Sequence, residues 1–571
     1  MLETPESWGE TQVRKRAAVE ILERLAMACQ REGLLSCRLN GTDLTLQAKD
    51  GGRLTLALGR LYSMNRFDLA GFPSELESVG PDGCFEWFLD ELLCPPPERR
   101  ETLLNELNNS YLNMALSLEA LKERGFGEPG AGDLADWESR VWSGHPLHPG
   151  ARLRSGVSAR DNRQYGPEWG AQLRLPLLSV PQDSLVQVGG FTDRIASLFP
   201  SLRTEVEPGR ALVPVHPWQR DNDLKTRFAS RFDSGELRFS GKTVPARPTM
   251  SFRTVVLQTE VGEDYHLKLP VAVQTTGATR TVSVAATQNG PKMSTFLARL
   301  FSHPEMTETG LFNQLHLMAE PASFHLKDPD PDRCRFLSGV LRQGPDEKSR
   351  FNGRWLLPAA ALLEPREAPL FNRAADYYGL QPLTLFTSYC RCLLPAQAYL
   401  CGQLGIALEA HPQNIVVDFR GRRGTAPDIH FWYRDLGGIR MHPERLTEAL
   451  QTRGWQDRLE VPEFWPGSAT STDSVRDLSS KFVYSLLQNH LGELIRSISR
   501  SGLSEDDFWG VVHDILDEHR LLMGADLEQR VFESRWDLKA MWTMRLDSAI
   551  TEYTYCPVDN PLLRGRKACP A

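Results

Sequence analysis

The spacing of apolar residues changes along the chain, and at the start it predicts helices with a small sheet. Residues 11–34 carry apolar side chains on one helical stripe, and residues 97–124 are a second helical region. Between them, residues 44–48 and 54–58 alternate apolar and polar side chains around Lys49-Asp-Gly-Gly52, which predicts a β-hairpin. We therefore expect a mainly helical first domain.

The middle of the chain contains most of the strand signal. Residues 247–257 and residues 265–275 are each expected to form one strand. Because side chains alternate faces along a strand, Ser251 and Arg253 are expected to share a face. A lone lysine in an apolar strand, as Lys268 is, costs free energy to bury unless it meets an anion. On a solvated sheet face it would have no such role.

The last third begins with an apolar run from Leu385 to Ala407, which predicts a buried helix. Residues 415–419 follow as a short β-branched strand, and a glycine–arginine turn leads to a second strand ending on Arg434-Asp435. Residues 479–499 and 505–519 are predicted to be helical. This region is therefore expected to be mainly helical around a pair of strands.

The corner between that helix and those strands suits a nucleotide and Mg²⁺. His411, Gln413 and Asn414 precede the first strand, and Asp435 ends the second. Mg²⁺ takes oxygen ligands, usually one or two carboxylates or amides together with the substrate's phosphates. Protein kinases use an Asn and an Asp in this relation. The alternative is that His411 and Asn414 merely cap backbone groups at the corner.

A histidine- and arginine-rich loop precedes the middle region. His148 follows another histidine by three residues and is followed by Arg152 and Arg154. The two histidines allow zinc to be considered, but zinc needs three or four ligands and no third is evident. Arginine binds carboxylate or phosphate in bidentate fashion, which favours an anion. The alternative is a solvated basic loop.

Residues 275–280 add hydroxyl groups and one more cation. Thr276 and Arg280 lie in this segment, so Lys268, Arg253 and Arg280 together have the charge to neutralise a triphosphate. The glycine-rich Walker sequence of other nucleotide-binding proteins is absent.

Length, charge and composition limit the classes of protein to which this chain can belong. The 571 residues exceed one ordinary core and suggest three or four domains. The net charge of -8 and the isoelectric point near 6.0 argue against nucleic acid as the main partner. Neither a membrane-spanning apolar run nor a signal peptide is recognisable. Ten cysteines without a Cys-x-x-Cys pair are typical of free thiols, so a cytoplasmic protein is expected.

Several motifs taken together resemble the IucA/IucC-type synthetases, which assemble siderophores without a nonribosomal peptide synthetase. The motifs occur in the family's order and are Gly144-His-Pro-Leu-His-Pro149, Tyr165-Gly-Pro-Glu168, His216-Pro-Trp-Gln219, Ser251-Phe-Arg-Thr254, Lys268, Thr276 with Arg280, His411-Pro-Gln-Asn414, Arg434-Asp435, Asn489-His-Leu491 and Asn560-Pro-Leu562. One departure is that Arg152 stands where the family usually has lysine. The resemblance covers residues 144–562.

The resemblance implies an α+β fold likened to a cupped hand. Its parts would be a mainly helical thumb at residues 1–165, β-rich fingers at residues 166–380 and a largely helical palm at residues 381–571, around one cleft. Family members are commonly homodimers.

The resemblance also implies roles for single residues. ATP and its acyl-adenylate would contact Ser251, Arg253, Thr254, Lys268, Thr276, Arg280, His411, Gln413 and Asn414. The acid substrate would contact His148, Arg152, Arg154 and Arg280, Mg²⁺ would be held by Asn414, Asp435 and Glu409, and catalysis would depend on Lys268, Arg280, His411, His148 and Arg253.

The implied reaction converts ATP and a polycarboxylic acid, most often citrate, into an acyl-adenylate and pyrophosphate. An amine or hydroxyl nucleophile then gives an amide or ester and releases AMP. 2-Oxoglutarate and a citrate monoamide remain alternative acyl donors. A kinase-like phosphotransferase and a non-catalytic carboxylate- or siderophore-binding protein remain alternatives of other classes.

Overall fold

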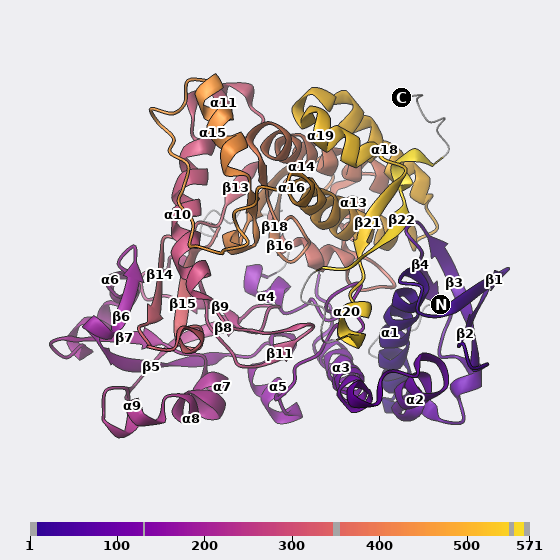
Figure 1. The fold of residues 1–571 in the computed structure, drawn as a ribbon, viewed down its shortest axis with the longest axis horizontal. Helices are drawn as coiled ribbons and strands as arrows, with labels where there is room; N and C mark the ends of the chain where they lie inside the picture. The colour runs from indigo at the N-terminus through magenta and orange to yellow at the C-terminus, as the bar shows by residue number, and fades with distance from the viewer. Residues whose placement is uncertain (1–7, 129–131, 346–353, 548–552, 565–571) are drawn as a thin grey trace.

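The computed structural model describes residues 8–128, 132–345, 354–547 and 553–564. We keep the names thumb (1–165), fingers (166–380) and palm (381–571) for the proposed division of the chain. In the thumb, two long helices lie side by side and a four-stranded antiparallel sheet flanks them (Figure 1). The predicted hairpin is confirmed, because the strands on either side of residues 49–52 pair in antiparallel register. The elements are α1 (Glu10–Arg31), β1 (Ser36–Asn40), β2 (Asp43–Gln47), β3 (Arg53–Tyr62), β4 (Arg66–Leu69), α2 (Gly80–Phe88), α3 (Pro97–Arg124), α4 (Leu134–Glu138) and α5 (Ala159–Tyr165).

The fingers are built on an eight-stranded sheet in the order β6-β14-β15-β10-β9-β8-β5-β7, with every neighbouring pair antiparallel. The strands are β5 (Leu173–Pro181), β6 (Leu185–Val188), β7 (Arg210–Pro214), β8 (Arg238–Pro248), β9 (Thr254–Gln258), β10 (Asp264–Lys268), β14 (Ala322–Leu326) and β15 (Ser338–Gln343). Around them lie α6 (Phe191–Leu198), α7 (Pro217–Gln219), α8 (Lys225–Arg227), α9 (Ala229–Asp233), α10 (Val284–Phe301), α11 (Pro304–Thr309) and α12 (Pro331–Cys334).

Two predicted strands of the fingers are shorter than expected. Residues 247–257 are not one strand, because the chain turns at 249–253 between β8 and β9, so the prediction that Ser251 and Arg253 share a strand face is wrong. The strand predicted over 265–275 ends at Lys268. Pro270 has no N–H for the sheet ladder, and the chain resumes as a short hairpin of β11 (Gln274–Thr275) and β12 (Ala278–Thr279).

The palm surrounds a second sheet in the order β13-β19-β18-β16, in which only β13 and β19 run parallel. Its strands are β13 (Leu315–Leu317), β16 (Arg354–Pro358), β18 (Ile415–Arg420) and β19 (Asp428–Tyr433), so residues from before position 381 supply two of the four. The predicted apolar helix is confirmed as α14 (Pro382–Leu404), and its apolar side chains enter the largest buried core.

Further helices cover that core, one of them from before position 381. They are α13 (Leu370–Tyr378), α15 (Pro443–Thr452), α16 (Val475–Phe482), α17 (Gly492–Ser499), α18 (Glu505–Glu518), α19 (Arg520–Phe532) and α20 (Thr543–Leu546), with small sheets of β17 (Ile406–Ala407) with β20 (Arg440–Met441) and β21 (Arg535–Lys539) with β22 (Tyr555–Asp559). Residues 483–491 connect α16 to α17 as a π-helical stretch. The region predicted as one helix over 479–499 is therefore continuous but changes its winding over residues 483–491, which include the motif Asn489-His-Leu491.

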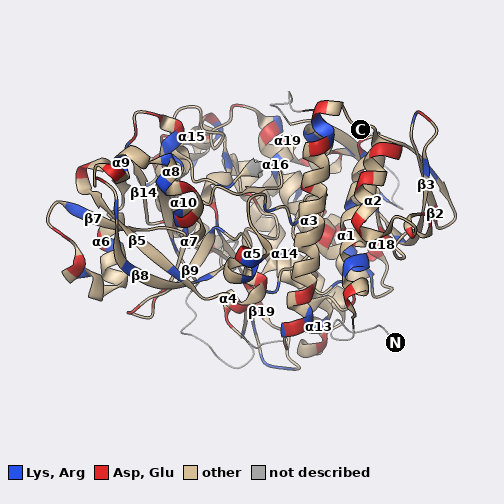
Figure 2. Cartoon of the chain, turned by 90° about the horizontal axis from the view of Figure 1, so that it is seen from below, with Lys and Arg blue, Asp and Glu red and all other residues tan. Residues whose placement is uncertain are grey.

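The predicted mixed α+β class is confirmed. Each of the nine cysteines in the described ranges is a free thiol. Among the described helices, none has the length and apolar content needed to cross a bilayer. Figure 2 shows acidic and basic residues interspersed along the elements.

Candidate active site

Three turns around the predicted site residues have strained backbones. Phe252, Thr276 and Asp435 have φ angles of 65°, 53° and 66°, in the left-handed region that non-glycine residues rarely adopt. Such conformations cost about 1–3 kcal/mol each and persist where the surroundings enforce them, often at functional sites. Each of the three turns carries predicted site residues: Ser251 to Thr254, Thr276 to Arg280, and Asp435 itself.

Lys268 of the fingers and Asp435 of the palm form an ion pair. Lys268 is the last residue of β10, and its Nζ lies 2.6 Å from Oδ1 of Asp435. Arg342 on β15 lies 4.0 Å from the same oxygen and 2.7 Å from Oε1 of Glu320. Burial alone would raise the pKa of Asp435, but Lys268, Arg342 and Arg253 hold that pKa well below its usual range. The Asp435 carboxylate is therefore ionised and interacts with these three cations.

Arg253 and Arg280 are cations that form no ion pair with a carboxylate of the described residues. Arg253 donates to the carbonyl of Thr281, and Arg280 donates to the hydroxyl groups of Thr275 and Thr276. Within the described parts of the chain, neither guanidinium has a carboxylate within 4 Å. Burial and the nearby Arg280 lower the pKa of Arg253 to about 10, against the opposite effect of Asp435. Two like charges held together in this way favour an incoming anion.

His411 does not cap a backbone group. His216 and His442, which also precede prolines, each accept a backbone N–H at Nδ1, at 3.2 and 3.4 Å. No hydrogen bond to the His411 ring is found within the described residues. Burial lowers the pKa of His411, so the ring is neutral near pH 7. Within the described chain the capping alternative finds support for Asn414, whose side chain contacts the Glu409 backbone oxygen, but no capping bond is found for the His411 ring.

The ring of His490 fixes the backbone just before His411. Its Nδ1 donates to the carbonyl of Ala410 at 3.1 Å, and its Nε2 accepts from the hydroxyl of Tyr389 at 2.7 Å. His490 lies in the π-helical stretch, a conformation that often marks functional sites.

The predicted metal ligands lie together at the palm corner. The side-chain Nδ2 of Asn414 is 3.2 Å from the backbone oxygen of Glu409 and 3.4 Å from its Oε2. The backbone carbonyl of Asn414 accepts a hydrogen bond from the backbone N–H of Arg434 at 3.0 Å. Lys481 pairs with the other Glu409 oxygen. The described residues contain no group of three or more His, Cys, Asp and Glu side chains able to hold a metal. Two carboxylates and an amide oxygen nevertheless fit Mg²⁺, since substrate phosphates supply its remaining ligands.

The thumb loop presents two neutral imidazoles. Nδ1 of His145 accepts the Leu147 N–H at 3.2 Å, and Nδ1 of His148 accepts the Gly150 N–H at 2.8 Å. These bonds place the ring proton on Nε2 in both histidines. Burial, with Arg545 and Arg280 nearby, lowers the pKa of His148 to about 3. Each ring therefore has an N–H donor for which no protein acceptor is found in the described chain.

Arg152 and Arg154 are buried and paired with an acid. Arg154 contacts both oxygens of Glu168, at 2.7 and 3.1 Å, and Arg152 lies 3.2 Å from the same carboxylate. Arg152 also donates to Ser117 on α3 at 3.0 Å. Glu168 and α3 thus fix the shape of the loop through these arginines, and their contact with substrate stays a prediction.

Three cations beside the site, Lys481, Lys539 and Arg342, were not predicted from the sequence. Lys481 pairs with Glu409, and the Lys539 amine lies over the Tyr484 ring at 4.8 Å from its centroid. Arg342 faces His266 across the β10–β15 pair. A lone cation in an apolar strand, the signal that identified Lys268, was also present for Arg342. The two lysines follow no recognisable motif.

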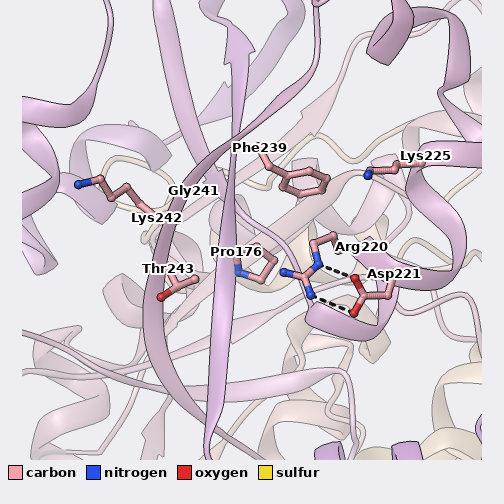
Figure 3. A pocket seen from close by; sticks show the side chains of 8 residues that line it. All are labelled: Pro176, Arg220, Asp221, Lys225, Phe239, Gly241, Lys242 and Thr243. Carbon is pink, nitrogen blue, oxygen red and sulfur yellow. Dashed lines mark hydrogen bonds and ion pairs between the residues drawn. The ribbon is translucent and has the colours of Figure 1, made fainter.

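A separate pocket of about 360 Å³ lies on the fingers (Figure 3). It is lined by Pro176, Arg220, Asp221, Lys225, Phe239, Gly241, Lys242 and Thr243. Nε of Arg220 lies 2.6 Å from Oδ1 of Asp221, so this ion pair offsets the charge of Arg220. No predicted site residue lines this pocket.

Two family models match the chain. The IucA / IucC family matches residues 133–364, and a model described as ferric iron reductase FhuF-like transporter matches residues 383–553. The first match includes the thumb loop and the fingers turns, and the second includes the palm corner. The resemblance to the IucA / IucC family is therefore confirmed over residues 133–364.

Curated relatives agree with this assignment. Staphyloferrin A synthase of Staphylococcus aureus is 28% identical over 457 residues, covering 75% of this chain and 73% of its own. The D-ornithine–citrate ligase of the same organism is 28% identical, covering 75% and 70%. Aerobactin synthase of Escherichia coli is 23% identical, covering 73% and 74%.

Solved structures share the fold over nearly the whole chain. The petrobactin biosynthesis protein AsbB of Bacillus anthracis superposes with a TM-score of 0.80 at 17% identity, covering 97% of this chain and 96% of its own. ATP-bound aerobactin synthetase IucA of Klebsiella pneumoniae gives 0.78 at 20% identity, covering 96% and 99%. The expected fold is therefore confirmed.

Proposed function

We propose that this protein is an ATP-dependent ligase of siderophore biosynthesis. It activates one carboxylate of citrate as an acyl-adenylate and transfers the acyl group to an amine or hydroxyl. The observation that carries this proposal is a pair of arginines near the Lys268–Asp435 ion pair. Arg253 and Arg280 form no ion pair with any carboxylate in the described chain. The names of relatives, which include citrate ligases and aerobactin synthase, support the substrate class.

In the first step a citrate carboxylate oxygen attacks the α-phosphorus of ATP. A bond forms between the carboxylate oxygen and the α-phosphorus. The bond from the α-phosphorus to the oxygen that bridges it to the β-phosphorus breaks, which releases pyrophosphate. Two anions must approach each other, so Lys268, Arg253 and Arg280 are proposed to offset their repulsion. Ser251, Thr254 and Thr276 supply hydroxyl donors to the same phosphates.

Asn414, Asp435 and Glu409 are the proposed ligands of Mg²⁺. The ion would supply positive charge that stabilises the phosphates during their displacement. Asp435 would then exchange its contact with Lys268 for one with the metal, which frees the lysine amine for a phosphate oxygen. Glu409 keeps Lys481 beside the corner.

The second step releases AMP. The nucleophile attacks the acyl carbon, the carbon–oxygen bond to the adenylate breaks, and the nucleophile loses a proton. Neutral His411 is the proposed acceptor of that proton, because its ring has no protein partner in the described chain. The Nε2–H donors of His145 and His148, with Arg280, are proposed to hold carboxylates of citrate.

Citrate is the preferred acyl donor, and 2-oxoglutarate and a citrate monoamide are the alternatives. A homodimer in the cytoplasm is also proposed. Free thiols persist in a reducing compartment.

The test is product analysis with ATP, Mg²⁺ and citrate, using hydroxylamine as a surrogate nucleophile. We expect pyrophosphate, AMP and a citryl hydroxamate. Pyrophosphate with 2-oxoglutarate but not citrate would change the substrate and keep the mechanism. ADP with a phosphorylated product would favour a phosphotransferase. Binding of citrate without nucleotide turnover would favour a binding protein.

A further inference from the structure

One thumb carboxylate contacts both the fingers and the palm. Glu138 is the last residue of α4 and is fully buried. Its Oε2 accepts the backbone N–H of Met250 at 3.1 Å, and its Oε1 accepts from Nη1 of Arg434. In Figure 1, α4 lies between β8 of the fingers and β16 of the palm sheet, and it contacts both.

Both contacts end at strained turns of the active site. Met250 immediately precedes Ser251 and Phe252, whose φ is 65°. Arg434 precedes Asp435, whose φ is 66°. A single carboxylate thus connects the turn proposed to bind phosphate with the turn proposed to bind Mg²⁺.

Arg434 extends this connection to the rest of the metal corner. Its Nε and Nη2 donate to the Gln413 carbonyl at 2.8 and 2.6 Å. Its backbone N–H donates to the Asn414 carbonyl at 3.0 Å. The Arg434 side chain is 5% exposed, so loss of the Glu138 charge would leave a buried cation without its counter-charge.

We propose that Glu138 is a positioning residue that sets the distance between the phosphate-binding turn and the Mg²⁺-binding corner. The inference rests on the proposed function for the identity of the ligand, ATP with Mg²⁺. Glu138 touches neither substrate nor metal and acts through Met250 and Arg434. Its removal should weaken Mg²⁺-ATP binding and leave citrate recognition, which depends on the thumb loop, unchanged.

A matched control lies on the same helix. Asp136 pairs with Arg247 of β8, and no palm contact of Asp136 is found among the described residues. Asp136→Asn therefore loosens a thumb–fingers contact without touching the metal corner. Any general effect of disturbing α4 should appear in both variants.

The experiment compares Glu138→Gln, Asp136→Asn and the unmodified full chain. Affinity for ATP is measured by calorimetry over a Mg²⁺ titration, and the KM values for ATP and citrate are measured by pyrophosphate release. In Glu138→Gln we expect ATP affinity and the Mg²⁺ midpoint to weaken by about tenfold, as for groups that orient metal ligands. The KM for citrate should stay unchanged, and Asp136→Asn should match the unmodified protein.

Equal ATP affinities in Glu138→Gln and the unmodified protein would overturn the positioning role, as would an equal loss in Asp136→Asn. If Glu138→Gln fails to fold, Arg434→Lys tests the same connection from the palm side and should give the same shift. If the unmodified protein binds ATP but releases no pyrophosphate, the ligase proposal fails, and the affinity comparison still decides the role of Glu138.

Discussion

Two clusters of buried charge differ in how completely they are neutralised. Where the thumb meets the palm and Arg366 of the fingers, carboxylates and guanidinium groups alternate and each carboxylate has at least two basic partners. The ion pairs join Glu20, Glu23, Asp68 and Glu493 to Arg16, Arg24, Arg66, Arg366, Arg496 and Arg500. In the active site, Arg253 and Arg280 have no such partner in the described chain.

The difference separates a structural cluster from a binding cluster. Burial alone would raise the pKa of Asp68, yet Arg496, Arg500 and Arg366 hold it well below its usual range. In that network every carboxylate and every arginine has an ionic partner within the protein, so its effect is to fix thumb against palm. The cluster around Arg280 is incomplete in charge, and an anionic substrate completes it.

Removing a cation from the complete network should have the largest effect on stability. Arg496→Met leaves Glu23 and Asp68 with fewer partners in a buried site, so the free energy of unfolding should fall by about 3–5 kcal/mol. Urea denaturation measures this change. Turnover per folded molecule should be unaffected. An unchanged denaturation midpoint would show that the network is not what fixes the two parts.

Removing a cation from the incomplete cluster around Arg280 should have the opposite effect, because activity should fall and stability should not. Arg280→Met should lower the rate of adenylation by about a hundred- to a thousandfold, as for loss of one oxyanion donor, while the denaturation midpoint stays the same or rises. Pyrophosphate release measures the rate. Arg220→Met, in the separate fingers pocket, is the control and should change neither quantity. Near-normal adenylation in Arg280→Met would remove that residue from the mechanism.

Glu364 is a carboxylate of the fingers that contacts the thumb, and no cation lies within 4 Å of it in the described chain. Burial raises its pKa to about 7, although Ser143 donates two hydrogen bonds to it. Because the folded pKa lies above the unfolded value near 4.5, its stability contribution is present below 4.5 and is lost as pH rises through about 7.

Glu364→Gln should therefore remove that pH dependence. Above pH 7 the variant should be more stable than the unmodified protein, by about 3 kcal/mol at most, and near pH 4.5 the two should be equal. Thermal denaturation across this pH range measures the difference. Parallel curves for the two proteins would place the ionisation elsewhere.

Asp435→Asn gives a smaller effect on the metal requirement. The amide keeps one oxygen for Mg²⁺ but loses the charge, so the Mg²⁺ midpoint of activity should rise by about tenfold. A magnesium titration of pyrophosphate release measures it. Asp428→Asn, on the exposed start of β19, serves as the control. An identical titration in Asp435→Asn would move the metal site to other ligands.

Local patterns in the sequence were sufficient for the regular elements. Apolar spacing predicted α1, α3 and α14, and β-branched residues predicted β18, because these signals lie within one segment. The turn at 249–253 was missed, since β-forming residues surround it and only tertiary contacts hold Phe252 at positive φ.

Family motifs located many candidate site residues, but their partners could not be read from the chain. Glu138 and Arg434 lie 296 positions apart, and Lys268 and Asp435 lie 167 apart. No pattern within a segment specifies pairs so distant. The same limit applies to Arg152 and Arg154, where the sequence shows two cations and the structure shows that Glu168 neutralises them.

The most direct test of the central claim follows the oxygen that citrate gives up. Citrate labelled with heavy oxygen in its carboxylates is incubated with the enzyme, ATP, Mg²⁺ and hydroxylamine, and the phosphorus products are analysed by mass spectrometry. Attack on the α-phosphorus within the Arg253 and Arg280 cluster predicts one labelled oxygen in AMP and none in pyrophosphate. Label in inorganic phosphate with formation of ADP would show attack on the γ-phosphorus, and would contradict adenylation.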